Sequence, residues 1–200
     1  QSTAAEVQAQ TNTAAVRANN SVIPPPTNPL APADSFTLPV ENDAVTVSLN
    51  ATPTIGTAID LATGRQIWAT PIDWDPAAAR IVCCGLSNRG VALYDGKVFV
   101  ASLDSYIKAL DAKTGKEIWR TQVADWKQGI AITGAPTVAN GVLMTGMAGG
   151  EYGVRGFVAG YDPNTGKELW RRFTTAGPGE PGSETWPKDD SYLRGGGSTW

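Results

Sequence analysis

ALDAKTGKEIW at residues 109–119 is the middle copy of a segment that occurs three times in this 200-residue chain. The first copy is AIDLATGRQIW at residues 58–68, and the third is GYDPNTGKELW at residues 160–170. The spacing between successive copies is 51 residues each time. In each copy a strand is expected to end at Asp, Thr-Gly to form a turn in which Gly takes a positive φ, and a second strand to run into Trp. Each copy therefore predicts a β-hairpin.

Further hairpins precede the second and third copies. Asp95-Gly96 stands between VALY and KVFV, and Asn140-Gly141 stands between PTVA and VLMTG. These dipeptides favour two-residue hairpin turns. About four short strands per repeat is typical of propeller blades. The sequence thus predicts an all-β fold of about three β-propeller blades, with the repeated Trp packed between neighbouring blades.

The repeats also suggest a division of the chain. Residues 1–50 are rich in Ala, Thr, Asn and Pro and predict an extended arm, which is either a loose tail or a segment that wraps a partner subunit. Residues 51–200 form the expected partial propeller. Its first blade is expected to be truncated, because only residues 54–57 separate ATP at 51–53 from the first copy. Since a four-bladed ring of such repeats needs about 204 residues, we expect an incomplete ring completed by the remainder of the propeller or by other subunits.

Composition excludes several function classes. The net charge is −3 with no basic run, which argues against nucleic acid as a partner. No stretch of 18 apolar residues occurs, so membrane contact is expected to be peripheral at most. Histidine is absent, which excludes His-dependent triads, His-ligated zinc and attached c-type haem on these residues. Gln1 in place of Met suggests an exported chain whose leader has been removed, although an arbitrary start within a longer chain would look the same.

Three features are candidates for chemistry. The third repeat has six extra residues in the loop GMAGGEYGVRG at 146–156, where small residues allow close backbone approach and Glu151 offers a hard oxygen; a flexible turn with a solvated Glu is the alternative. For the adjacent Cys83 and Cys84, spacing alone favours two buried thiols, whereas an oxidising compartment would favour a strained disulfide. Arg89 is either a surface charge or an anion contact.

Four segments together resemble one family: CCGLSNRGVALYDGKVFVASLDSYIKALDAKTGKEIW (83–119), ITGAPTV (132–138), GGEYGVRGFVAGYDPNTGKELW (149–170) and GGGSTW (195–200). The chain resembles the periplasmic alcohol dehydrogenases that depend on pyrroloquinoline quinone (PQQ), whose propellers have eight blades. The resemblance implies that a Cys83–Cys84 disulfide lies against one face of PQQ and Trp200 against the other. It also implies that Arg89 contacts the reactive quinone oxygens and that Glu151 ligates Ca²⁺ or a lanthanide acting as a Lewis acid. The remaining implied cofactor contacts are Thr133, Ala148, Gly149, Gly150 and Ser198.

The resemblance also has departures. Asn50 stands where the family has an acid, and Ala148 stands where Ser is common. The family's general-base Asp and metal-binding Asn follow the position of Trp200 and are not among these residues.

The resemblance implies part of an enzyme that oxidises small primary alcohols to aldehydes in the periplasm, either free there or at the outer face of the inner membrane. Electrons would pass to cytochrome c or to a membrane quinone. The alternative is a non-catalytic accessory subunit, derived from a truncated propeller, that binds and stabilises a dehydrogenase complex.

Overall fold

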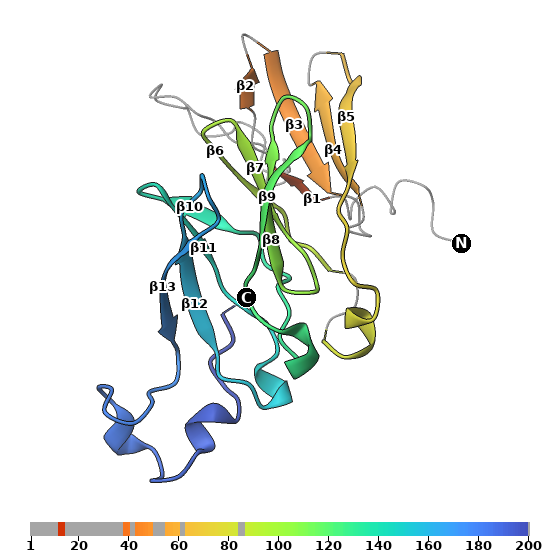
Figure 1. The fold of residues 1–200 in the computed structure, drawn as a ribbon. Coiled ribbons are helices and arrows are strands. Elements are labelled where there is room, and N and C mark those ends of the chain that lie inside the picture. The colour runs from red at the N-terminus through yellow and green to blue at the C-terminus, as the bar shows by residue number, and fades with distance from the viewer. Residues whose placement is uncertain are drawn as a thin grey trace, which may run out of the picture.

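The computed structural model describes the strands within residues 12–14, 38–40, 43–49 and 55–60, and then residues 63–83 and 87–199. Three antiparallel sheets follow one another along the chain (Figure 1). The described helices are five short 3₁₀ turns, none of which has the length of a membrane-spanning helix. They are η1 (Ala78–Arg80), η2 (Trp126–Gln128), η3 (Gly150–Tyr152), η4 (Ser183–Thr185) and η5 (Ser191–Leu193).

The second and third sheets each have four strands in sequence order, as expected for blades. The second sheet comprises β6 (Val91–Tyr94), β7 (Lys97–Ala101), β8 (Tyr106–Asp111) and β9 (Glu117–Gln122). The third comprises β10 (Thr137–Ala139), β11 (Val142–Thr145), β12 (Phe157–Tyr161) and β13 (Glu168–Phe173). The edge strands β6 and β10 contact each other. The prediction of an all-β chain with about three propeller blades is confirmed.

The first sheet has five strands, so the expectation of a truncated first blade is wrong. Its strands are β1 (Asn12–Ala14), β2 (Leu38–Val40), β3 (Asp43–Leu49), β4 (Ile55–Asp60) and β5 (Gln66–Pro71). The strand missing from the repeat itself is supplied by β3, which pairs antiparallel with β4 from Val45↔Asp60 to Leu49↔Gly56. Three strands of this sheet thus lie in the segment expected as an arm. The domain boundary at residue 50 stays a prediction.

The hairpin turns have the predicted chemistry. Asp95 and Gly96 both have positive φ values, 48° and 68°, as the two central residues of a mirror-image hairpin turn require. Asn140 and Gly141 repeat this at 49° and 73°. In the 51-residue repeat, the Asp that ends one strand accepts the N–H of the turn Thr, at 2.7 Å for Asp60, 2.8 Å for Asp111 and 3.1 Å for Asp162. In each of the three copies, the Asp side chain therefore caps the turn.

The repeated Trp docks each blade onto the turn of the next, which confirms its predicted place between blades. Trp68 Nε1 donates to Ala112 O in the second blade at 2.9 Å, and Trp119 Nε1 donates to Pro163 O in the third at 3.2 Å. The turn glycine lies against the indole each time, so that a Cβ on Gly115 would come within 2.7 Å of the Trp68 ring. The same arrangement of Trp indole, carbonyl acceptor and turn glycine thus joins the first blade to the second and the second to the third.

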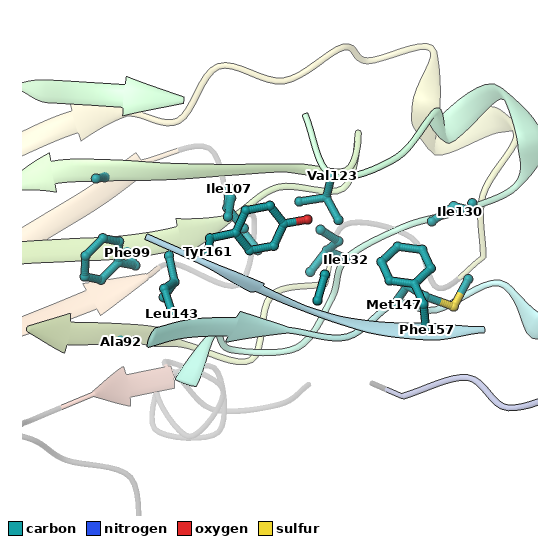
Figure 2. Packing of buried hydrophobic residues seen from close by; sticks show 13 residues of the cluster. Ala92, Phe99, Ile107, Val123, Ile130, Ile132, Leu143, Met147, Phe157 and Tyr161 are labelled. Carbon is teal, nitrogen blue, oxygen red and sulfur yellow. The ribbon is translucent and has the colours of Figure 1, made fainter. Parts of the chain in front are cut away.

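Apolar residues fill the spaces between blades. Figure 2 shows the cluster between the second and third sheets, to which Phe99, Leu143, Phe157 and Tyr161 contribute large side chains. Successive residues of β7 point to opposite faces, so Phe99 joins this cluster while Val98 and Val100 join the cluster facing the first sheet. Because the second blade is covered on both faces, β7 is apolar without interruption from Val98 to Ala101.

Candidate functional site

Arg89 and Thr133 are brought together where the chain enters the edge strands of the second and third blades. The Arg89 N–H donates to Thr133 O at 3.0 Å, and Arg89 Nη1 donates to Thr133 Oγ1 at 2.7 Å. Thr133 is fully buried, whereas Arg89 is exposed. The guanidinium is thus oriented by a fully buried neighbour on an otherwise exposed residue, and a guanidinium is a group suited to contact with an anion or a polarised oxygen.

A backbone bridge brings Ala148 close to Arg89 and Thr133. Ala148 and Ala131 form a two-way antiparallel bridge, with N···O distances of 2.8 and 3.1 Å, and Thr133 follows two residues after Ala131. Both alanines are fully buried in a small cluster with Trp126 of η2, and half-buried Cys83 packs against that cluster. The sequence-predicted Cys83, Thr133 and Ala148 therefore belong to one continuous part of the fold.

Gly149 and Gly150 open η3 in the predicted insertion. This loop, residues 146–156, separates β11 from β12, where only residues 102–105 separate β7 from β8, so the insertion is confirmed. Gly149 has a φ of 117°, and a Cβ there would collide with Gly129 O. The Gly150 N–H donates to Ser198 Oγ at 2.9 Å. Gly149, Gly150 and Ser198 are thus brought together.

The close approach at the glycine loop is made by the chain itself. A Cβ on Gly150 would collide with Ser198 Oγ, and a Cβ on Gly146 would collide with Thr199. Thr199 is anchored here: its N–H donates to Met147 O at 2.9 Å, and its Oγ1 donates to Phe157 O at 2.6 Å. Sequence reasoning missed Thr199. The small residues of the loop allow residues 198–199 to pack beside Gly149 and Gly150, which were expected to contact a cofactor.

Glu151 is exposed on η3, one residue after Gly150. Among the residues that the structure describes, no three Asp, Glu, Cys or His side chains come together as a ready-made metal site. Glu151 would therefore be a single protein carboxylate on a metal ion, with the other oxygen ligands coming from elsewhere.

Two of the expected site residues, Cys84 and Trp200, lie outside the described residues. Cys83 is not a free thiol, and its disulfide with Cys84 stays a prediction. The roles expected for all the site residues likewise stay predictions.

Arg155, at the end of the glycine loop, is a second arginine that sequence reasoning passed over. Its Nε and Nη2 donate to Thr175 O at 3.0 and 2.6 Å, and Nη2 also pairs with Glu180 at 2.7 Å. These partners lie 20 and 25 residues further along the chain. No spacing rule links residues so far apart, so the only available signal was the position of Arg155 in the inserted loop.

A separate polar cleft of about 270 Å³ lies between the first and second blades. Lys108 on β8 is 2% exposed and donates to Asp73 O. Burial lowers the pKa of Lys108 from its ordinary value, and nearby Asp104 opposes that shift. Among the described residues, no hydrogen bond joins Lys108 to those expected to bind a cofactor.

Comparison with known proteins agrees with this architecture. The family model of the outer membrane protein assembly factor BamB matches residues 51–197. Quinohemoprotein alcohol dehydrogenase ADH IIB of Pseudomonas putida is 44% identical over 155 residues. The structure of a europium-containing methanol dehydrogenase superposes with a TM-score of 0.72 at 36% identity, over 79% of this chain and 31% of that one. The chain belongs to the quinoprotein alcohol dehydrogenase family. Lanthanide-dependent methanol dehydrogenase of Methylacidiphilum fumariolicum, another relative, is 41% identical over 150 residues.

This chain corresponds to only part of those quinoprotein dehydrogenases. The alignments cover 72% and 66% of this chain, but 22% of ADH IIB and 24% of the lanthanide-dependent enzyme. The chain thus spans less than a quarter of the length of these curated relatives.

Proposed function

We propose that this chain forms part of a PQQ-dependent dehydrogenase that oxidises primary alcohols to aldehydes, and that it contributes one wall of the PQQ site. The observation that carries the proposal is the convergence of Arg89, Thr133, Ala148, Gly150 and Ser198. Arg89 bonds Thr133 and Gly150 bonds Ser198. The backbone bridge between Ala131 and Ala148, two residues before Thr133 and Gly150, joins these two pairs into one network that spans 109 sequence positions. Family membership supports the same assignment.

The donor set fits the proposed cofactor. PQQ carries carboxylate and quinone oxygens, which accept hydrogen bonds. Arg89 supplies a permanent cation, and the hydroxyl groups of Thr133 and Ser198 lie in the same network. Bound PQQ would supply the two-electron acceptor for the hydride that leaves the alcohol carbon. Arg89 would donate to the reactive quinone oxygen and stabilise negative charge that develops there.

The remaining roles follow the family pattern. A Cys83–Cys84 disulfide would cover one face of the ring and Trp200 the other, while Ala148 and Gly149 would line its edge. Glu151 would hold Ca²⁺ or a lanthanide at the cofactor. The names of two relatives include a lanthanide. We propose cytochrome c or a membrane quinone as electron acceptor and the periplasm as location.

A titration of the chain with PQQ and Ca²⁺, followed by absorbance, tests the proposal. Saturable binding is expected, and Arg89→Gln should weaken it about 10- to 100-fold, because a hydrogen bond to a charged group is lost. Arg120→Gln is the matched control, since Arg120 pairs with Glu117 on β9 outside this network and its loss should leave the affinity unchanged. Binding that is equally strong in Arg89→Gln would contradict the proposed site. Absence of saturable binding would favour the scaffold role of an accessory subunit.

A further inference from the structure

The segment after β13, residues 174–199, forms a long excursion that returns to the glycine loop. It contains η4 and η5 and ends with Ser198 and Thr199 docked on residues 147–150. Among the described residues this excursion leads directly to the position of Trp200. Whatever fixes the excursion therefore also fixes Ser198 and Thr199 beside the glycine loop.

Arg155 is the central contact between the third blade and this excursion. Its guanidinium makes two hydrogen bonds to the buried Thr175 carbonyl and an ion pair with Glu180. Its Cζ lies 3.9 Å from the centroid of the Phe173 ring and 5.2 Å from that of Tyr192 in η5. The Arg155 side chain is 13% exposed, so its hydrogen bonds to Thr175 O are partly shielded from water, whereas Glu180 is 50% exposed and the ion pair is open to solvent on that side.

Further bonds within the excursion depend on this geometry. Glu180 Oε2 also accepts the Gly177 N–H at 2.6 Å, and the Gly177 N–H and then Arg155 hold the pKa of Glu180 below its ordinary value. Thr175 Oγ1 donates to Tyr192 O at 3.0 Å. Arg155 therefore contacts both the start of the excursion and, through Thr175 and Tyr192, the part that leads to the GGGSTW segment.

We propose that Arg155 is a positioning residue, which holds residues 174–199 against the third blade so that Ser198 and Thr199 stay beside the cofactor site. The proposal deepens the proposed function and rests on it for the link to PQQ. Arg155 acts through the excursion and does not itself contact the cofactor.

Hydrogen exchange of the full 200-residue chain tests the holding role without any cofactor. In Arg155→Gln, amides of residues 174–199 should exchange at least about tenfold faster, because the bonds to Thr175 O and the ion pair are lost together. Arg155→Lys keeps the charge but not the forked geometry, so it should give an intermediate rate.

Arg171→Gln is the matched control. Arg171 makes the same kinds of contact in the same blade, pairing with Glu168, donating to Val123 O at 2.8 Å and stacking 4.0 Å from the Phe157 ring centroid, but none of these involves the excursion. It should leave exchange in residues 174–199 unchanged. An excursion that exchanges at the wild-type rate in Arg155→Gln, or equally fast in both variants, would overturn the proposal.

PQQ affinity then tests the positioning role by a double-mutant cycle with Trp200→Leu. Arg155→Gln should weaken PQQ binding about tenfold in the wild-type background, the size of effect typical of groups that orient a ligand-binding residue, but should cause no further loss in Trp200→Leu. Equal losses in both backgrounds would overturn action through the end of the excursion. If the wild-type chain bound no PQQ, the proposed function would fail, and the exchange experiment alone would decide whether Arg155 holds the excursion.

Discussion

Gly166→Ala tests the contact that joins the second and third blades. Gly166 has a φ of 72°, and a Cβ there would lie 2.5 Å from Thr121 Oγ1 and 2.6 Å from the Trp119 ring. Ring and hydroxyl must therefore move away. That movement disturbs two inter-blade hydrogen bonds, Trp119 Nε1 to Pro163 O and Thr121 Oγ1 to Gly166 O at 2.8 Å.

Gly64→Ala provides a control that separates backbone strain from packing. Gly64 occupies the same position in the first repeat, with a φ of 69°, but a Cβ there meets nothing within 4 Å among the described residues. Both substitutions cost about 1–2 kcal/mol for a left-handed non-glycine residue. Only Gly166→Ala adds overpacking of about 1–3 kcal/mol and weakening of two hydrogen bonds worth about 1 kcal/mol each. We therefore expect Gly166→Ala to destabilise the chain by about 3 kcal/mol more than Gly64→Ala.

Thermal unfolding followed by circular dichroism measures this difference. For a domain of this size, 3 kcal/mol corresponds to a Tm roughly 6–12 °C lower in Gly166→Ala than in Gly64→Ala. Tryptophan emission should also shift in Gly166→Ala as Trp119 is displaced. Equal Tm values for the two variants would refute the idea that the repeated turn glycine exists to receive the neighbouring Trp.

Three further predictions concern individual side chains. Trp119→Phe should destabilise the chain by about 1–2 kcal/mol more than Trp170→Phe in urea unfolding, because the described part of the chain gives the Trp170 indole no acceptor like Pro163 O; equal costs would contradict this. Lys108 has a folded pKa below its ordinary 10.5, so its ammonium destabilises the fold at neutral pH, and the penalty disappears as pH rises towards 10.5. Lys108→Met should therefore change Tm more favourably at pH 7 than near pH 10.5, whereas the same change at both pH values would contradict this assignment. Glu151→Gln should abolish the increase in PQQ affinity caused by Ca²⁺ or La³⁺ and leave metal-free binding within about twofold, as titrations with and without the ion would show.

Features that depend on local geometry could be predicted from the sequence. An Asp three residues before Thr can accept its N–H in any protein, and Asp-Gly or Asn-Gly adopts positive φ without help from distant residues, so the hairpins were correctly predicted. The first blade was not, because its additional strands lie before residue 51, outside the repeated segment. The alternation of Val45, Val47 and Leu49 in β3 was the available strand signal.

Contacts between distant residues could not be predicted in this way. Arg89 and Thr133 were both expected near a cofactor, but nothing in the sequence indicates that they bond each other across 44 residues. The glycines at 146 and 150 were interpreted as room for a ligand, and the structure places residues 198–199 against them. A small residue indicates close approach without indicating what approaches.

Titration of the ¹⁵N-labelled chain with PQQ and Ca²⁺, monitored by NMR, shows whether the network that contains Arg89, Thr133 and Ser198 is part of a PQQ site. The account predicts progressive shifts of the amides of Gly90, Gly149 and Gly150, which adjoin Arg89, Thr133 and Ser198, while the hairpin-turn amides of Gly96 and Gly141 stay in place. Shifts centred on the hairpin turns, or none at saturating PQQ, would contradict the assignment of this network as part of a PQQ site.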